Sequence, residues 1–193
     1  MATGFRNTAR GIAGSLPSAE RALLGKLFGD VIELLTGRQE VHALDDEVDP
    51  LYALTGMRPS DAQLPVPSDP AVHRLLPDAS QDPEVAAEFR RLTEADLLSE
   101  KLGRLREGQL LLESEKVLFG DTAQATRFAQ ALNDVRLVLA TRLDIEDEAD
   151  AERIGQILDA AEVQTQEDYL ALVYNLVSWL QDSLMSALLN EQA

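Results

Sequence analysis

The stretch from Asp121 to Leu143 reads DTAQATRFAQALNDVRLVLATRL, and its spacing predicts the helix around which the chain is organised. Asp121 is a residue type that caps helix N-termini, and Gln124 stands three positions later, as in a capping box. Apolar side chains then recur at intervals of three and four, at Phe128, Leu132, Val135 and Leu139. Other apolar residues widen this stripe to more than half of the helical surface, so we expect the helix to lie inside the protein.

Polar residues of this helix fall within or beside its apolar arc, at Asn133, Asp134, Arg136 and Arg142. A buried charge without a partner is costly. We therefore expect Arg142, together with Arg136, to form a structural ion pair with a carboxylate of a neighbouring helix.

Composition indicates a protein of 193 residues that folds as one domain, with 45% hydrophobic residues and no cysteine. No apolar run approaches the roughly 20 residues of a membrane helix. A formal net charge of −17 repels nucleic-acid phosphate and anionic lipid, so the expected partner is a protein. These properties, with the absence of thiol chemistry, predict a cytoplasmic location, and they leave a homodimer open.

The predicted fold is a mainly α, single-domain helical bundle of about five long helices with short Pro-initiated helices. Residues 1–16 are expected to form an N-terminal tail or a short strand, and residues 17–193 the helical domain. A small two-stranded ribbon could pair this strand with Val117–Phe119.

The first predicted helix begins at Ser18 and ends near Thr36, with Gly37 as its stop signal. Gly25 and Gly29 suggest the close approach of a neighbouring backbone. Two short helices should begin at proline, one over residues 49–56 and one after Asp69. The segment between them is interpreted as a solvated connection, with a functional loop as the alternative.

A further helix should begin at Pro83 and carry Val85, Phe89 and Leu92 as apolar residues, with a break or kink where Thr93 resembles a new cap. Its continuation is rich in basic residues that alternate with acids, which is typical of a solvated face with ion pairs. Arg90, Arg91 and Arg104 are candidate partner contacts there, whereas a nucleic-acid face is the less favoured interpretation.

The C-terminal part should contain two helices, over residues 149–161 and from Thr165 to about Asn190. Thr165 and Asp168 form a capping box at the start of the second helix. Its apolar positions leave little polar surface, and Trp179 is expected to widen the buried face.

Catalytic and metal-binding motifs are missing from the sequence. It has only His42 and His73 as histidines and lacks the zinc-protease, P-loop, dinucleotide-binding and nucleophile-elbow patterns. We predict neither a metal nor a cofactor and no enzymatic activity. An enzyme with a carboxylate site is kept as an alternative, because 34 acidic residues make chance pairs unavoidable.

Five phrases together resemble one protein family: ALNDVRLVLATRLDI (131–145), VYNLVSWLQDSL (173–184), SDPAVHRLLPDA (68–79), DPLYALTG (49–56) and EFRRLTEADL (88–97). It is an actinobacterial family long known as a domain of unknown function, and its members are described as oxidative-stress transcriptional regulators. The most specific phrase contains Asn133, Asp134, Arg136 and Arg142.

This resemblance implies a regulator that contacts a stress sigma factor after a cysteine pair is oxidised to a disulfide. Genes of the family lie near that of the ClpS adaptor, which implies an accessory factor in ClpS-linked proteolysis as an alternative. The present chain has no cysteine and lacks that thiol switch. We therefore expect a non-enzymatic regulator that acts through protein contacts without a thiol signal.

Overall fold

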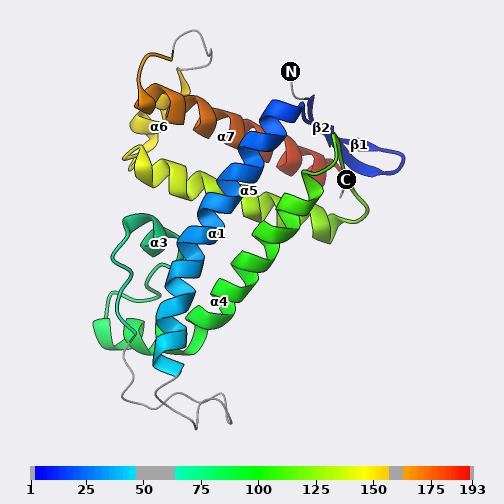
Figure 1. Ribbon diagram of the computed structural model, residues 1–193. Coiled ribbons are helices and arrows are strands. Elements are labelled where there is room, and N and C mark those ends of the chain that lie inside the picture. Colours follow the sequence, from blue (N-terminus) through cyan, green and yellow to red (C-terminus); the bar gives the residue numbers. More distant parts are fainter. Residues whose placement is uncertain (1–2, 47–63, 157–162, 192–193) are drawn as a thin grey trace.

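A computed structural model describes residues 3–46, 64–156 and 163–191 (Figure 1). The elements in chain order are β1 (Thr3–Thr8), β2 (Gly11–Ser15), α1 (Ser18–Asp46), α3 (Pro70–Leu75), α4 (Pro83–Leu111), β3 (Lys116–Phe119), α5 (Thr122–Arg142), α6 (Glu148–Gly155) and α7 (Gln166–Glu191). The chain is thus mainly helical, as expected, with a small antiparallel sheet at one end.

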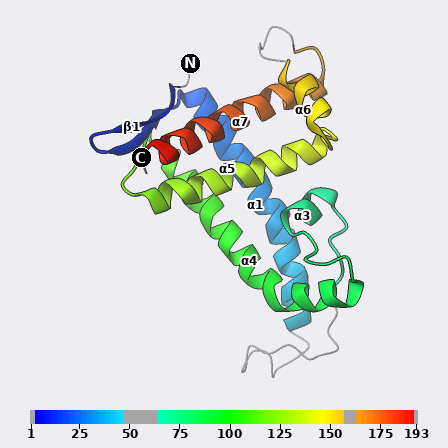
Figure 2. The same ribbon diagram turned by 180° about the vertical axis from the view of Figure 1, so that it is seen from behind.

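Helix α5 is the centre of the domain, because it packs against α1, α3, α4 and α7. Seen from behind, α5 and α7 run side by side, and α1 passes behind them and continues beside α4 (Figure 2). The side chain of Asp121 accepts a hydrogen bond of 2.7 Å from the amide of Gln124, whose side chain accepts one of 3.4 Å from the amide of Gly120. The predicted central helix and its cap are therefore confirmed.

Four phenylalanines join the sheet to the helices in the core. Phe128 of α5 lies between Phe5, Phe28 and Phe119, with ring centroids 6.1, 5.8 and 5.4 Å away. Such pairs contribute about 0.5 to 1.5 kcal/mol each beyond the area they bury. This cluster fixes the position of the sheet on the helical layer.

The sheet has three strands in the order β1-β2-β3, so the expectation of a two-stranded ribbon was one strand short. β2 pairs with β3 as predicted for the N-terminus and Val117, and β1 folds back on β2. Gly11 has a φ of 109°, and a Cβ there would lie 2.3 Å from the carbonyl oxygen of Phe119. Only glycine fits at this position, where the chain turns from β1 into β2.

The outer edge of β1 is covered by α7. The amide of Phe5 donates to Ser183 Oγ at 3.1 Å, and the side chain of Asn7 donates to the carbonyl of Ala187 at 2.9 Å. Residues 3–15 thus form two strands, of which β1 is hydrogen-bonded to α7.

Helix α1 continues past Gly37, so the predicted stop near Thr36 was wrong. The residue after this glycine, Arg38, is buried and donates a hydrogen bond to Glu94 of α4. This contact stabilises the continuation of α1 beyond Gly37. The expected backbone approach at Gly25 and Gly29 is also wrong. A Cβ at Gly25 meets nothing within 4 Å, and the side chain of Gln109 approaches instead, donating to the Gly25 carbonyl at 3.0 Å.

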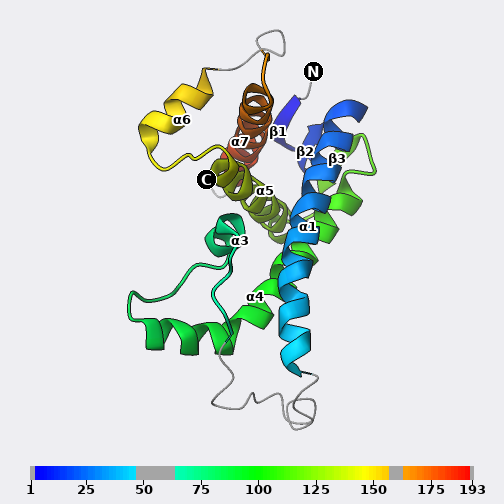
Figure 3. The same cartoon turned by 60° about the vertical axis from the view of Figure 1, so that its left-hand side comes forward.

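Helix α4 is hydrogen-bonded without a break over Pro83–Leu111, but its first turns point in a different direction from the rest (Figure 3). The hydroxyl of Thr93 donates to the carbonyl of Phe89, four residues earlier, at 2.9 Å. Back-bonding of this kind often bends helices. The predicted kink is therefore seen, whereas a new helix start at Thr93 is not.

The remaining helix starts follow the capping pattern. Asp69 caps α3, and Thr165 and Asp168 exchange two hydrogen bonds of 2.9 and 3.1 Å at the start of α7. Helix α6 covers Glu148–Gly155 and thus starts one residue earlier than predicted. Residues 157–161 of the predicted 149–161 helix lie outside the described residues. The predicted 49–56 helix lies wholly outside them. Within the described part of the chain, no helix has the length and apolar character needed to cross a membrane.

Candidate functional site

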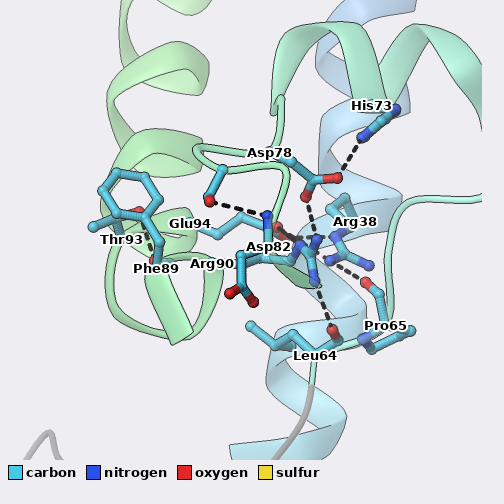
Figure 4. A network of polar contacts seen from close by, with 11 residues as sticks. Arg38, Leu64, Pro65, His73, Asp78, Asp82, Phe89, Arg90, Thr93 and Glu94 are labelled. Atoms are coloured by element: carbon cyan, nitrogen blue, oxygen red, sulfur yellow. Dashed lines mark hydrogen bonds and ion pairs between the residues drawn. The ribbon is translucent and has the colours of Figure 1, made fainter. Parts of the chain in front are cut away.

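The bend of α4 is held by a chain of ion pairs that begins at Arg38 of α1. Arg38 Nε donates to Glu94 Oε1 at 2.5 Å, and both side chains are buried. The same guanidinium donates to the carbonyl of Pro65 at 2.7 Å. One arginine thus ties α1 to α4 and to the segment that leads into α3 (Figure 4).

Arg90 extends this chain on the other side of Glu94. Its Nε lies 3.8 Å from Glu94 Oε2, its Nη1 donates to the carbonyl of Leu64 at 3.3 Å, and its Nη2 donates to Asp78. The second carboxylate oxygen of Asp78 lies 3.2 Å from His73 Nε2. Hydrogen bonds from Arg90 and His73 hold the pKa of Asp78 below its ordinary value.

We name the set Arg38, Glu94, Arg90, Asp78 and His73 the corner network. Its charges alternate in sign, and its carboxylates face arginines of the same chain. The buried Glu94 carboxylate accepts hydrogen bonds from Arg38 and has Arg90 as a second positive neighbour, so its charge is compensated inside the protein. The arrangement connects α1, α3 and α4.

A second charged cluster lies between α4 and α5. Asp134, which is 1% exposed, accepts bonds from Lys101 Nζ at 2.8 Å and from Arg104 Nη2 at 2.7 Å. Asp134, placed at the margin of the apolar arc by the sequence, is thus the buried carboxylate of α5. The internal ion pair that was assigned to Arg142 is made here instead.

The prediction of a solvated basic face on α4 is wrong for Arg90, Lys101 and Arg104, which are only 7 to 8% exposed. Lys101 and Arg104 pair with the buried Asp134 of α5, and Arg90 pairs with Glu94 and with Asp78, which follows α3. The partners from outside α4 are not revealed by spacing along that helix. Arg91 does follow the prediction, since it pairs with Glu88 on the surface at 2.7 Å. As a candidate partner contact it remains a prediction.

The other motif residues occupy the surface or its margin. Arg142 Nη2 lies 2.7 Å from Asp69 Oδ2, so it has a carboxylate partner, but its side chain is 43% exposed. Arg136 is not in that pair and lies 3.4 Å from the side-chain oxygen of Asn133, which also accepts a bond from Gln181. Arg142 was therefore paired as predicted but not buried as predicted.

Trp179 does not belong to the buried face of α7, since it is 44% exposed. Its ring lies beside Gly4 of β1, where a Cβ would come within 3.3 Å of it. The prediction that Trp179 widens the buried face is therefore wrong, because its ring lies at the surface beside β1.

The first turns of α4 carry an exposed apolar stripe, defined by Val85, Phe89 and Leu92. These side chains are 53, 49 and 61% exposed, although their spacing of four and three residues is that of a core-facing helix. The bend of α4 carries these turns away from the body of the domain (Figure 3). A shallow hollow beside Phe89 is lined by Leu76, Pro77, Ala86 and Leu97. Sequence analysis predicted these residues as apolar but gave no sign that they would be exposed among the described residues 3–46, 64–156 and 163–191.

A larger cavity of about 470 Å³ lies on the other side of Arg90. Its walls are mostly apolar or uncharged, and the charged side chains that reach it, Asp78 and Arg90, are paired with each other. Among the described residues, no group of three or more histidine, aspartate or glutamate side chains is placed to hold a metal ion. The walls of the cavity are thus mainly apolar surface.

Comparison with protein families finds one that spans almost all of this fold. A family described as DUF2017, a domain of unknown function, matches residues 2–188. Comparisons with curated proteins and with solved structures give no match. The match includes every element described above except the last three residues of α7, and the chain belongs to the DUF2017 family.

Proposed function

We propose that this protein is a non-enzymatic regulator that acts through contacts with another protein. The observation that carries the proposal is the apolar stripe of Val85, Phe89 and Leu92, left uncovered on a helix that the corner network holds in place. Apolar patches that a monomer leaves exposed often mark interaction sites. The stripe has the spacing by which one helix recognises another.

The distribution of charge supports a protein partner over DNA. Three of the basic residues of α4 are buried against carboxylates, and surface Arg91 is paired with Glu88. Strong duplex binding needs several lysines or arginines free to displace counterions from phosphates. Such a cluster is not formed by the described part of α4, so regulation of transcription would be relayed through a protein.

The resemblance to oxidative-stress regulators gives this proposal its finer form. The partner would be a component of the transcription machinery in the cytoplasm, such as a sigma factor, reached without a thiol switch because the chain has no cysteine. A component of ClpS-linked proteolysis is the alternative partner. The identity of the captured protein decides between the two.

The test is site-specific photo-crosslinking in the native cells. A photoreactive phenylalanine analogue replaces Phe89 in one variant and Leu189, an exposed apolar residue of α7, in the control. We expect one protein to be crosslinked from position 89 and not from position 189, and to bind the purified chain at micromolar or lower concentration. Crosslinks to no protein, or to the same mixture from both positions, would overturn the proposal.

A further inference from the structure

The apolar stripe has a mainly acidic rim. Five acidic residues between Asp82 and Glu100 have exposed side chains: Asp82, Glu84, Glu88, Asp96 and Glu100. The same span contains two cations, of which Arg90 is buried against Asp78 and Glu94, and Arg91 is held by Glu88. Glu88 is paired with Arg91, and Glu100 Oε1 lies 3.6 Å from Arg104 Nη1. The face of α4 around the stripe is therefore negative mainly through Asp82, Glu84 and Asp96.

We infer that this face binds a basic amphipathic helix of the partner, an inference that rests on the proposed function. The occupant would present apolar side chains at intervals of three and four to Val85, Phe89 and Leu92, as ridges pack into grooves between helices. Its lysines or arginines would lie opposite Glu84, Glu88 and Asp96. One apolar side chain of the occupant would rest over the hollow between Phe89 and Leu76.

Charge distinguishes this occupant from a second copy of the chain. A symmetric dimer through the stripe would place one acidic rim against an identical one, because a two-fold interface uses the same patch on both subunits. Like charges facing each other disfavour such a complex. A basic helix instead gains from the rim, mainly through faster association at low salt.

The bend of α4 prepares the face for binding. Glu94 and Arg90 lie on the buried side of the same turns, where they are bonded to Arg38 and Asp78. The stripe is thus displayed on a segment whose backbone is already ordered, which lowers the entropy cost of binding.

The probe is a designed helical peptide of about 16 residues with leucines at i, i+4 and i+7 and lysines beside them. Its twin carries glutamate in place of every lysine. Fluorescence anisotropy with the full chain at about 0.05 M salt should show saturable binding of the lysine peptide and none of the glutamate twin. Phe89→Asp should weaken the binding about tenfold or more, and Leu189→Asp should leave it unchanged.

Two further readouts address the rim and a second copy. The double variant Glu88→Gln, Asp96→Asn should bind the lysine peptide more weakly and lose part of its salt dependence. Sedimentation should show the wild-type chain as a monomer. A wild-type dimer that Phe89→Asp dissociates would overturn the inference, because a second copy of the chain would then occupy the stripe. A crosslink from position 89 to another part of the same chain would also overturn it, because that part of the chain would then cover the stripe.

Failure of this inference can be told apart from failure of the proposed function. One outcome is that position 89 captures a native partner that binds the purified chain, while neither the lysine peptide nor a basic helix of that partner binds the stripe. In that case the inference is overturned and the proposed function stands. Equal binding of both peptides, or full binding by Phe89→Asp, also overturns it. If position 89 captures nothing and the peptide does not bind, both proposals fall.

Discussion

Arg38 Nε lies 2.5 Å from Glu94 Oε1 in the interior of the protein, 56 positions apart in the sequence. This pair joins the second half of α1 to the bend of α4, and Arg90 and Asp78 continue it towards α3. The exposed stripe lies on the opposite side of the same turns of α4. The pair therefore fixes the segment to which we assign recognition.

Glu94→Gln should destabilise the fold by about 3 to 5 kcal/mol, because it removes the carboxylate charge that faces the buried Arg38 and leaves Arg90 with Asp78 alone. Urea unfolding followed by circular dichroism measures the loss. Glu88→Gln is the matched control on the same helix, since Glu88 is 56% exposed and pairs with Arg91 on the surface. The control should change stability by about 0 to 1 kcal/mol. Equal effects of the two substitutions would show that the corner network adds no more than a surface pair.

Asp134→Asn tests the second buried cluster in the same way. It removes the charge that faces Lys101 and Arg104, and we expect a loss of about 3 to 5 kcal/mol in the free energy of unfolding. Arg142→Ala is the comparison on α5. Its pair with Asp69 is 43 and 32% exposed, so the expected loss is about 0 to 1 kcal/mol. A larger loss from Arg142→Ala than from Asp134→Asn would contradict this assignment of the buried charge.

Gly108→Ala and Gly25→Ala should change stability in opposite directions. A Cβ at Gly108 would lie 2.5 Å from Cε2 of the buried Phe28, which is overpacking and costs about 1 to 3 kcal/mol. A Cβ at Gly25 meets nothing within 4 Å, and alanine is favoured over glycine in a helix by about 0.5 to 1 kcal/mol. Thermal unfolding of the two variants gives the signs. Stabilisation by Gly108→Ala would mean that α1 and α4 are less closely packed than described.

The Asp78 carboxylate should make stability depend on acid pH. Bonds from Arg90 and His73 lower the pKa of Asp78 in the folded state, whereas the unfolded value is about 3.9. The contribution is therefore complete above the unfolded pKa and is lost as the pH falls through the lower, folded pKa. Urea midpoints between about pH 7 and pH 3 should fall less steeply below pH 4 for Asp78→Asn than for the wild type. Parallel curves would contradict the role given to Asp78.

Helix positions and caps could be predicted from the sequence because their causes are local. Asp121, Asp69 and the pair of Thr165 and Asp168 act on amides two or three residues away, so the residue types alone indicate them. Gly37 was misinterpreted as a helix end for the opposite reason. What extends α1 is the bond from Arg38 to Glu94, and no local pattern contains it.

The candidate site could be predicted only in part. The apolar spacing of Val85, Phe89 and Leu92 was visible, but exposure depends on what packs against a helix. Likewise, Arg90 and Arg104 alternate with acids as surface residues do, while their partners Asp78 and Asp134 come from other elements. Burial of a charge is decided by tertiary contacts, and a single sequence does not show them.

The affinity of the captured partner for Phe89→Asp tests the central claim most directly. Phe89 is 49% exposed, so the substitution should change the free energy of unfolding by no more than about 0.5 kcal/mol. Binding of the purified partner, measured by calorimetry beside wild type and Leu189→Asp, should weaken about tenfold or more in Phe89→Asp alone. An unchanged affinity in a folded Phe89→Asp protein would contradict the account, because the stripe on α4 would then not be the surface that binds.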